Sequence, residues 1–125
     1  DAESLTELHR RKTGALITAP LEMGGLAAGA TDRRMATLRR YGSAVGLAFQ
    51  IADDILDATS DADALGKNPS DADLEKSTYV GLFGLEEAGR RANALVADAV
   101  GALRQDPIDS PPLEAIARFI VNRRS

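Results

Sequence analysis

One stretch of the chain combines an almost entirely apolar surface with clustered acidic groups, and it runs from Gly46 to Asp57. Before its last residue, its only polar side chains are those of Gln50, Asp53 and Asp54. No proline interrupts the stretch and no glycine follows its first residue, so the pattern predicts a helix. A helix that is apolar nearly all round is normally buried. The sequence therefore predicts carboxylates placed in or beside the core.

Helical spacing would bring these acidic groups together on one face. Asp53 and Asp57 are four residues apart, which is about one turn, and Gln50 lies one turn before Asp53. Clustered carboxylates repel one another, and their burial is costly unless a cation compensates. Two explanations stay open at this point. The carboxylates either pair with arginine or reach water at a helix end, or they bind a divalent metal. Oxygen ligands on a rigid helix suit Mg²⁺, which takes waters and substrate phosphates as its other ligands.

Composition limits the fold class and the partners. The 125 residues suffice for one domain. The composition, with 44% hydrophobic but only 4% aromatic residues, favours an all-α fold over a sheet. A net charge of −4 gives no reason to expect nucleic acid. The absence of cysteine and the single histidine exclude a disulfide framework and a histidine-rich or thiolate zinc site.

The cellular location is predicted from what the sequence lacks. No run resembles a signal peptide and none is long enough to span a membrane, so we expect a cytoplasmic protein. The chain starts at Asp1 inside a helical pattern, which favours a fragment over a natural terminus.

The apolar spacing predicts helices along most of the chain, with no strand pattern. We expect helices opening with a capping box at Ser4–Glu7, over 15–28 with a kink at Pro20, from 31 or 32 to about 57, over 77–84, from 85 to about 103, and from 110 or 111 to the C-terminal arginines. Residues 59–76 are expected to form a polar loop. The expected buried positions are Tyr41, Phe83, Leu85, Ala88, Ala92, Leu95, Ala99, Leu113, Ile116, Ala117, Phe119 and Ile120.

Lysine is scarce, which makes its positions informative. The three lysines, Lys12, Lys67 and Lys76, each adjoin Gly, Ser or Thr, whereas twelve arginines carry the remaining basic charge. A compact ammonium on a flexible stem suits contact with phosphate. Lys12 has a second explanation, because a lysine there could simply cap the end of the first helix.

Taken in order, these motifs resemble the C-terminal half of the trans-isoprenyl diphosphate synthases, also called polyprenyl synthetases. The matching runs are KTGALI at 12–17, GLAFQI at 46–51, DDILD at 53–57, LGK at 65–67 and KSTY at 76–79. With GLEEA at 84–88, the chain is most similar to the short-chain, farnesyl diphosphate synthase type. The resemblance implies the C-terminal helices of an all-α bundle around a deep pocket. It also implies that residues 1–125 form the C-terminal portion of one catalytic domain whose N-terminal half is absent.

The family's reaction implies roles for particular residues. Its members condense an allylic diphosphate with isopentenyl diphosphate head to tail through an allylic carbocation, and Mg²⁺ bridges the allylic diphosphate to two aspartate-rich motifs. By resemblance, Asp53, Asp54 and Asp57 would form the second of these motifs. Asp53 would bind Mg²⁺ directly and Asp57 through a water, while Asp54 would hold the motif or a lysine in place.

Other residues would meet the substrates. Lys12 and Lys67 would contact the allylic diphosphate, Thr13 and Gln50 would line the position of the cation, and Phe49 would flank the isopentenyl substrate. Arg123 and Arg124 resemble a basic tail that helps to close the pocket.

The family's first aspartate-rich motif and its basic residues for isopentenyl diphosphate have no counterpart here, because they lie in the N-terminal half. We therefore expect the fragment alone to be inactive. The complete enzyme is also expected to be a homodimer. Two alternatives remain: a truncated non-catalytic homologue or subunit that binds diphosphate or a partner chain, and an unrelated helical metal-binding module.

Overall fold

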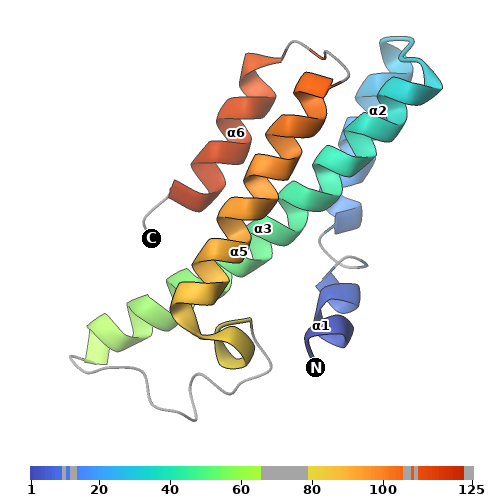
Figure 1. Ribbon diagram of the computed structural model, residues 1–125. Helices are drawn as coiled ribbons and strands as arrows, with labels where there is room; N and C mark the ends of the chain where they lie inside the picture. The colour runs from blue at the N-terminus through green and yellow to red at the C-terminus, as the bar shows by residue number, and fades with distance from the viewer. Residues whose placement is uncertain (10, 12–13, 66–78, 106–107, 109, 123–125) are drawn as a thin grey trace.

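The chain folds into five labelled helices in a computed structural model that describes residues 1–9, 11, 14–65, 79–105, 108 and 110–122 (Figure 1). The helices are α1 (Ala2–His9), α2 (Ala15–Ala27), α3 (Asp32–Leu65), α5 (Tyr79–Gln105) and α6 (Pro111–Asn122). Every regular element among the described residues is a helix, so the prediction of an all-α fold is confirmed. None of these helices is both long enough and apolar enough to cross a membrane.

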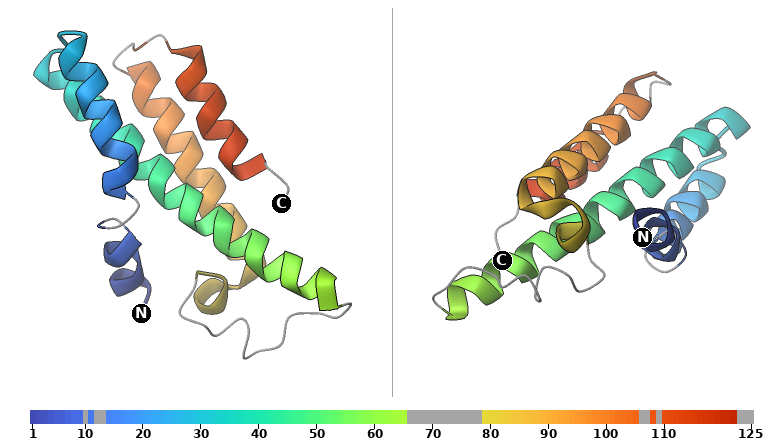
Figure 2. Two further views of the ribbon diagram at one scale, coloured as in Figure 1. Left: turned by 180° about the vertical axis from the view of Figure 1, so that it is seen from behind. Right: turned by 60° about the horizontal axis from the view of Figure 1, so that its bottom comes forward.

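The helix α3 is the centre of the arrangement, because it contacts each of the other four helices. Figure 2 shows α2 and α1 along one side of α3, with α5 and α6 along the other. The acidic stretch lies in the second half of α3. The other four helices are therefore arranged around the helix that carries the candidate site.

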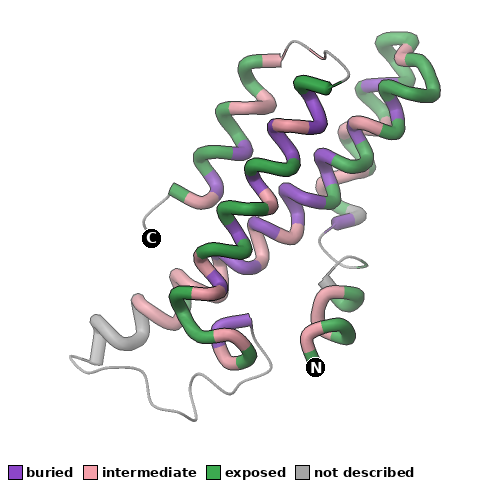
Figure 3. Tube along the Cα trace, in the orientation of Figure 1, coloured by how far each residue is buried: buried purple, intermediate pink, exposed green. Residues whose placement is uncertain are grey.

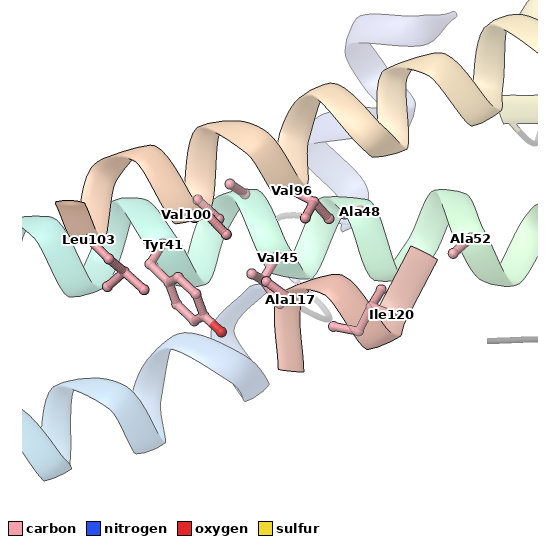
Figure 4. Packing of buried hydrophobic residues seen from close by; sticks show 11 residues of the cluster. Tyr41, Val45, Ala48, Ala52, Val96, Val100, Leu103, Ala117 and Ile120 are labelled. Atoms are coloured by element: carbon pink, nitrogen blue, oxygen red, sulfur yellow. The ribbon is translucent and has the colours of Figure 1, made fainter. Parts of the chain in front are cut away.

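The main core lies between α3, α5 and α6 (Figure 4). Its largest side chains are Tyr41 and Leu103, which are 2% and 1% exposed. Small residues also belong to this core on both helices, as Ala48 in α3 and Ala99 in α5 are fully buried. Alanine at such positions lets the two helix backbones approach closely, which explains why α3 and α5 form the most extensive helix pair.

A second cluster of buried side chains lies beside the acidic stretch. It contains Ile51 of α3 and Tyr79, Val80, Ala88 and Ala92 of α5. Partly buried Leu5 of α1 packs against it, which attaches the first helix to the rest of the fold. Figure 3 shows that the buried positions of α3 and α5 face each other, whereas the described residues of α1 are half-buried or exposed.

The helix α3 is longer than the sequence predicted, since it continues to Leu65 instead of ending near Asp57. The predicted loop from residue 59 is therefore wrong over its first turns. The sequence reads as a loop there because it is rich in Asp, Ser and Thr, but no glycine or proline occurs between Gly46 and Gly66. The Thr59 hydroxyl donates a 2.8 Å hydrogen bond to the Ile55 carbonyl within the helix, so this polar residue is compatible with it.

Two glycines end or interrupt helices at the predicted helix boundaries after residue 28 and at residue 84. Gly29 has φ 73° just after the end of α2, and Gly84 has φ 82° at a kink within α5. This left-handed region favours glycine, which has no Cβ. The predicted break at Gly84 is confirmed.

The first helix begins earlier than the capping box indicated. The backbone N–H of Ser4 donates to the Asp1 carboxylate at 2.7 Å, so Asp1 caps a helix that starts at Ala2. The helix α2 runs unbroken through Pro20.

Several residues predicted as core are exposed. Leu85 is 38% exposed, Ile116 51% and Phe119 67%. These predictions were wrong because an apolar helix position shows only that a side chain could be buried. It does not show which neighbouring element covers it.

Candidate functional site

The second half of α3 places the candidate residues one turn apart. Gln50, Asp53 and Asp57 follow one another along a single face of this continuous helix. Gln50 and Asp53 are half-buried, and Asp57 is exposed. Phe49 is also half-buried and packs against the main core. The acidic face therefore changes from partly buried to solvent-exposed over about two turns.

The helix α2 covers the same face of α3, but nearer the N-terminus of α3. A Cβ built on Gly42 would meet Thr18, and one built on Gly46 would lie 3.4 Å from the Cα of Gly14. Because α2 begins at Ala15, its contact with this face ends at the level of Gly46. Gln50 and the aspartates lie beyond that point on α3.

Asp54 has a different environment from its neighbours. Its Oδ2 accepts a 3.1 Å hydrogen bond from the backbone N–H of Tyr79, the first residue of α5. A first-turn N–H has no acceptor inside its own helix, so the carboxylate supplies one from another helix. This contact agrees with a role in which Asp54 holds the motif in place, and it occupies one of the two oxygens that could bind a metal.

The acidic face offers a limited donor set for a metal. Among the described residues, no group of three His, Cys, Asp or Glu side chains could hold an ion. Asp53 and Asp57 do supply two hard carboxylates on a rigid helix. That set suits Mg²⁺, which commonly binds one or two protein carboxylates and completes its coordination with waters and substrate phosphates.

Five predicted site residues fall in other parts of the chain. Lys12, Thr13, Lys67, Arg123 and Arg124 lie outside the residues that the structure describes. The roles assigned to them by resemblance stay predictions.

The backbone next to Thr13 is described, and it lies close to the candidate site. Gly14 follows Thr13 directly in the sequence and packs against Gly46, one turn before Gln50. The start of α2 and the acidic half of α3 are therefore neighbours.

A cleft of about 1190 Å³ between α1, α3 and α5 has no counterpart among the sequence predictions. Its lining includes Thr6 of α1, Leu47 and Ile51 of α3, and Tyr79 and Phe83 of α5, but none of the aspartates of the acidic motif. Among its charged lining residues, Arg11 pairs with Glu7, Asp98 with Arg40, and Arg91 with Glu87. The cleft is therefore lined by other residues than the acidic face, and these paired charges are already compensated.

Tyr79 is the residue that sequence reasoning missed. It belongs to the KSTY motif, but the sequence indicates no function for it. The structure joins it to two other helices, since its N–H donates to Asp54 of α3 and its hydroxyl donates to Thr6 of α1 at 3.1 Å. Its ring also stacks on Phe83 of its own helix, with centroids 6.4 Å apart. No local sequence signal predicts contacts with residues 25 and 73 positions away.

Comparison with known proteins identifies the family to which this arrangement belongs. The family model of the polyprenyl synthetases matches residues 1–110. The chain belongs to the polyprenyl synthetase family. The resemblance predicted from the sequence is thereby confirmed, together with the bundle to which these helices belong.

Relatives in this family include enzymes with different products. The chain is 44% identical to the farnesyl diphosphate synthase of Escherichia coli K12, covering 97% of this chain and 42% of the relative. It is 42% identical to the geranylgeranyl diphosphate synthase of Cyanophora paradoxa, covering 98% and 41%. A crystal structure from Marinomonas sp. MED121, of a protein assigned as a farnesyl-diphosphate synthase, superimposes with a TM-score of 0.72 at 34% identity. That match covers 94% of this chain and 39% of the other.

The chain thus spans about two fifths of the length of the curated relatives that it matches. Within this span it carries the KTG, DDILD and KSTY runs on which the resemblance was based.

Proposed function

We propose that the complete protein containing these residues is a prenyltransferase of isoprenoid biosynthesis. It would condense an allylic diphosphate with isopentenyl diphosphate head to tail, and this chain would supply the second aspartate-rich motif. The observation that carries the proposal is the alignment of Gln50, Asp53 and Asp57 along one face of α3 in a member of this family. Homology to farnesyl and geranylgeranyl diphosphate synthases supports the reaction class.

The acidic face would hold Mg²⁺ through Asp53 directly and through Asp57 by way of a water. The ion would neutralise the diphosphate as it leaves the allylic carbon. The protein's own contribution is positional: Ala48, Ile51 and Ala52 are buried, so the helix that carries the carboxylates is fixed against α5 and α6. Asp53 and Asp57 therefore lie on a rigid element, as a metal site requires.

The neighbouring groups would serve the organic part of the substrates. The amide oxygen of Gln50 would turn its dipole towards the developing allylic cation, one turn from Asp53. Phe49 would offer its partly buried ring beside the isopentenyl group. Lys12 and Lys67 would neutralise further diphosphate charge, and Thr13 would add an oxygen dipole. The homodimer and the cytoplasmic location expected from the sequence stay predictions.

A radiochemical assay on the complete gene product tests the proposal. Labelled isopentenyl diphosphate and geranyl diphosphate should give a longer prenyl diphosphate and inorganic pyrophosphate, and EDTA should stop the reaction. The 125-residue chain alone should be inactive in the same assay. Diphosphate binding without condensation by the complete protein would overturn the proposal and indicate a non-catalytic homologue.

A further inference from the structure

Tyr79 lies where three helices meet. It is the first residue of α5 and only 2% exposed. Its side chain belongs to the second cluster, which includes Ile51 of α3 and has Leu5 of α1 packed against it. A tyrosine enclosed in this way cannot move without disturbing α1 and α3 together.

The two ends of Tyr79 are held by different hydrogen bonds. Its backbone N–H donates to Oδ2 of Asp54, and its hydroxyl donates to Oγ1 of Thr6, each at 3.1 Å. The first bond is made to Asp54, which directly follows Asp53 in the acidic motif. The second reaches α1, which otherwise has few contacts with the bundle.

These contacts give the hydroxyl an indirect effect on the metal-binding face. Asp54 can accept from the Tyr79 N–H only while the start of α5 keeps its place beside α3. The hydroxyl bond to Thr6 and the stacked ring of Phe83 keep it there. A fixed Asp54 limits rotation of α3 about its own axis, and that rotation decides where Asp53 and Asp57 point.

We infer that Tyr79 is a positioning residue for the acidic motif, because its hydroxyl on Thr6 keeps its backbone N–H on Asp54 and so orients Asp53 and Asp57. This inference rests on the proposed magnesium–diphosphate function of that motif. In this role Tyr79 would act through Asp54 and would not itself contact metal or substrate.

The protonation state of the phenol agrees with this role. Burial raises the pKa of Tyr79 above its usual value, and the charge of Asp54 raises this pKa further, while the bond to Thr6 lowers it. The hydroxyl therefore stays protonated, and able to donate, throughout the neutral range.

Tyr79→Phe in the complete protein tests the inference, because it removes the hydroxyl and keeps the ring. One net hydrogen bond corresponds to about a two- to tenfold change in an equilibrium constant. We expect the apparent dissociation constant for Mg²⁺ in the presence of inorganic pyrophosphate to rise by about this factor. The readout is calorimetric titration, supported by a smaller rise in Tm when Mg²⁺ and pyrophosphate are added. Neither measurement requires turnover.

Thr6→Val removes the other partner of the same bond and should weaken binding by a similar factor. The double variant should be no weaker than either single variant, since both changes break one interaction. A purely local packing role for Tyr79 would not couple it to Thr6 in this way.

Tyr41→Phe is the matched control. Tyr41 is also 2% exposed, and its hydroxyl donates to the Leu113 carbonyl at 2.6 Å, far from the acidic motif. This variant should lose stability while its affinity for Mg²⁺ and pyrophosphate stays unchanged. If Tyr79→Phe behaves like Tyr41→Phe, the inference is overturned and the proposed function stands. If the unmodified protein fails to bind Mg²⁺ and pyrophosphate, the inference and the proposed function are both overturned.

Discussion

A Cβ added to Gly42 of α3 would lie 2.9 Å from the hydroxyl oxygen of Thr18 in α2, and 3.4 Å from the Thr18 Cα. One turn farther along α3, Gly46 faces Gly14 in the same manner. The two glycines of α3 allow α2 to approach closely along the line that leads to Gln50. The close contact between α2 and α3 therefore determines where the covered part of this face ends and the acidic part begins.

The substitution Gly42→Ala should destabilise the protein. Overpacking against Thr18 costs about 1–3 kcal/mol, which exceeds the gain of about 1 kcal/mol in helix propensity from glycine to alanine. Gly89→Ala is the matched control, because a Cβ at Gly89 of α5 would meet nothing within 4 Å. That variant should be more stable by about 0.5–1 kcal/mol. Urea unfolding of both variants of the complete protein measures the difference, and equal stabilisation of the two would contradict this account.

Tyr41 should make stability depend on alkaline pH. Burial raises the pKa of Tyr41 to about 12, against about 10 in an unfolded chain. A raised folded-state pKa gives stability that is complete below about pH 10 and is lost as the pH rises towards about 12. Two pKa units correspond to about 2–3 kcal/mol of unfolding free energy.

Comparison with Tyr41→Phe isolates this contribution. At neutral pH the unmodified protein should be the more stable of the two, because its hydroxyl donates to Leu113. Its advantage should shrink between about pH 10 and about pH 12 in urea unfolding experiments. If the difference in unfolding free energy between the two proteins stays constant over this interval, folding does not raise the pKa of Tyr41 and the prediction is wrong.

Much of the fold could be predicted because its signals are local. The apolar spacing of three and four residues and the glycines at 29 and 84 are readable over short segments, and the structure confirms the helices that they indicated. The end of α3 was missed for a related reason. Acidic and hydroxyl residues read as a loop, yet they form further helical turns in the absence of glycine or proline.

The candidate site was less predictable because part of it depends on distant contacts. The shared face of Gln50, Asp53 and Asp57 follows directly from helical periodicity. The hydrogen bond from Tyr79 to Asp54 joins residues 25 apart on different helices, so the periodicity of a single helix cannot predict it. The exposure of Phe119 could not be predicted for the same reason, because an apolar helix face does not show which other element packs against it.

Asp53→Ala in the complete protein should abolish most of the prenyl transfer. Loss of a group that stabilises the departing diphosphate charge should lower kcat by about 100-fold or more. Stability should change little, by about 0.5 kcal/mol, because Asp53 is only half-buried. Asp98→Ala is a suitable control, since Asp98 pairs with Arg40 and lies away from the acidic motif. An unchanged kcat in Asp53→Ala would refute the assigned role.

The 125-residue chain on its own should associate with itself through α2. Leu16, Met23 and Leu26 are 76%, 69% and 70% exposed, and they recur along one side of that helix. Burying a large apolar side chain contributes about 1.5–3 kcal/mol, so three neighbouring ones favour association. Sedimentation velocity should show species larger than the 13.2 kDa monomer.

Lysine substitutions at two sets of positions distinguish association through α2 from a general effect of added charge on solubility. Met23→Lys combined with Leu26→Lys should shift the chain towards the monomer, because two ammonium groups cannot be buried in an apolar contact. Ala36→Lys combined with Asn93→Lys adds the same charge at exposed positions of α3 and α5 and should leave association unchanged. A single sharp monomer boundary for the unmodified chain would show that the exposed side of α2 does not drive self-association.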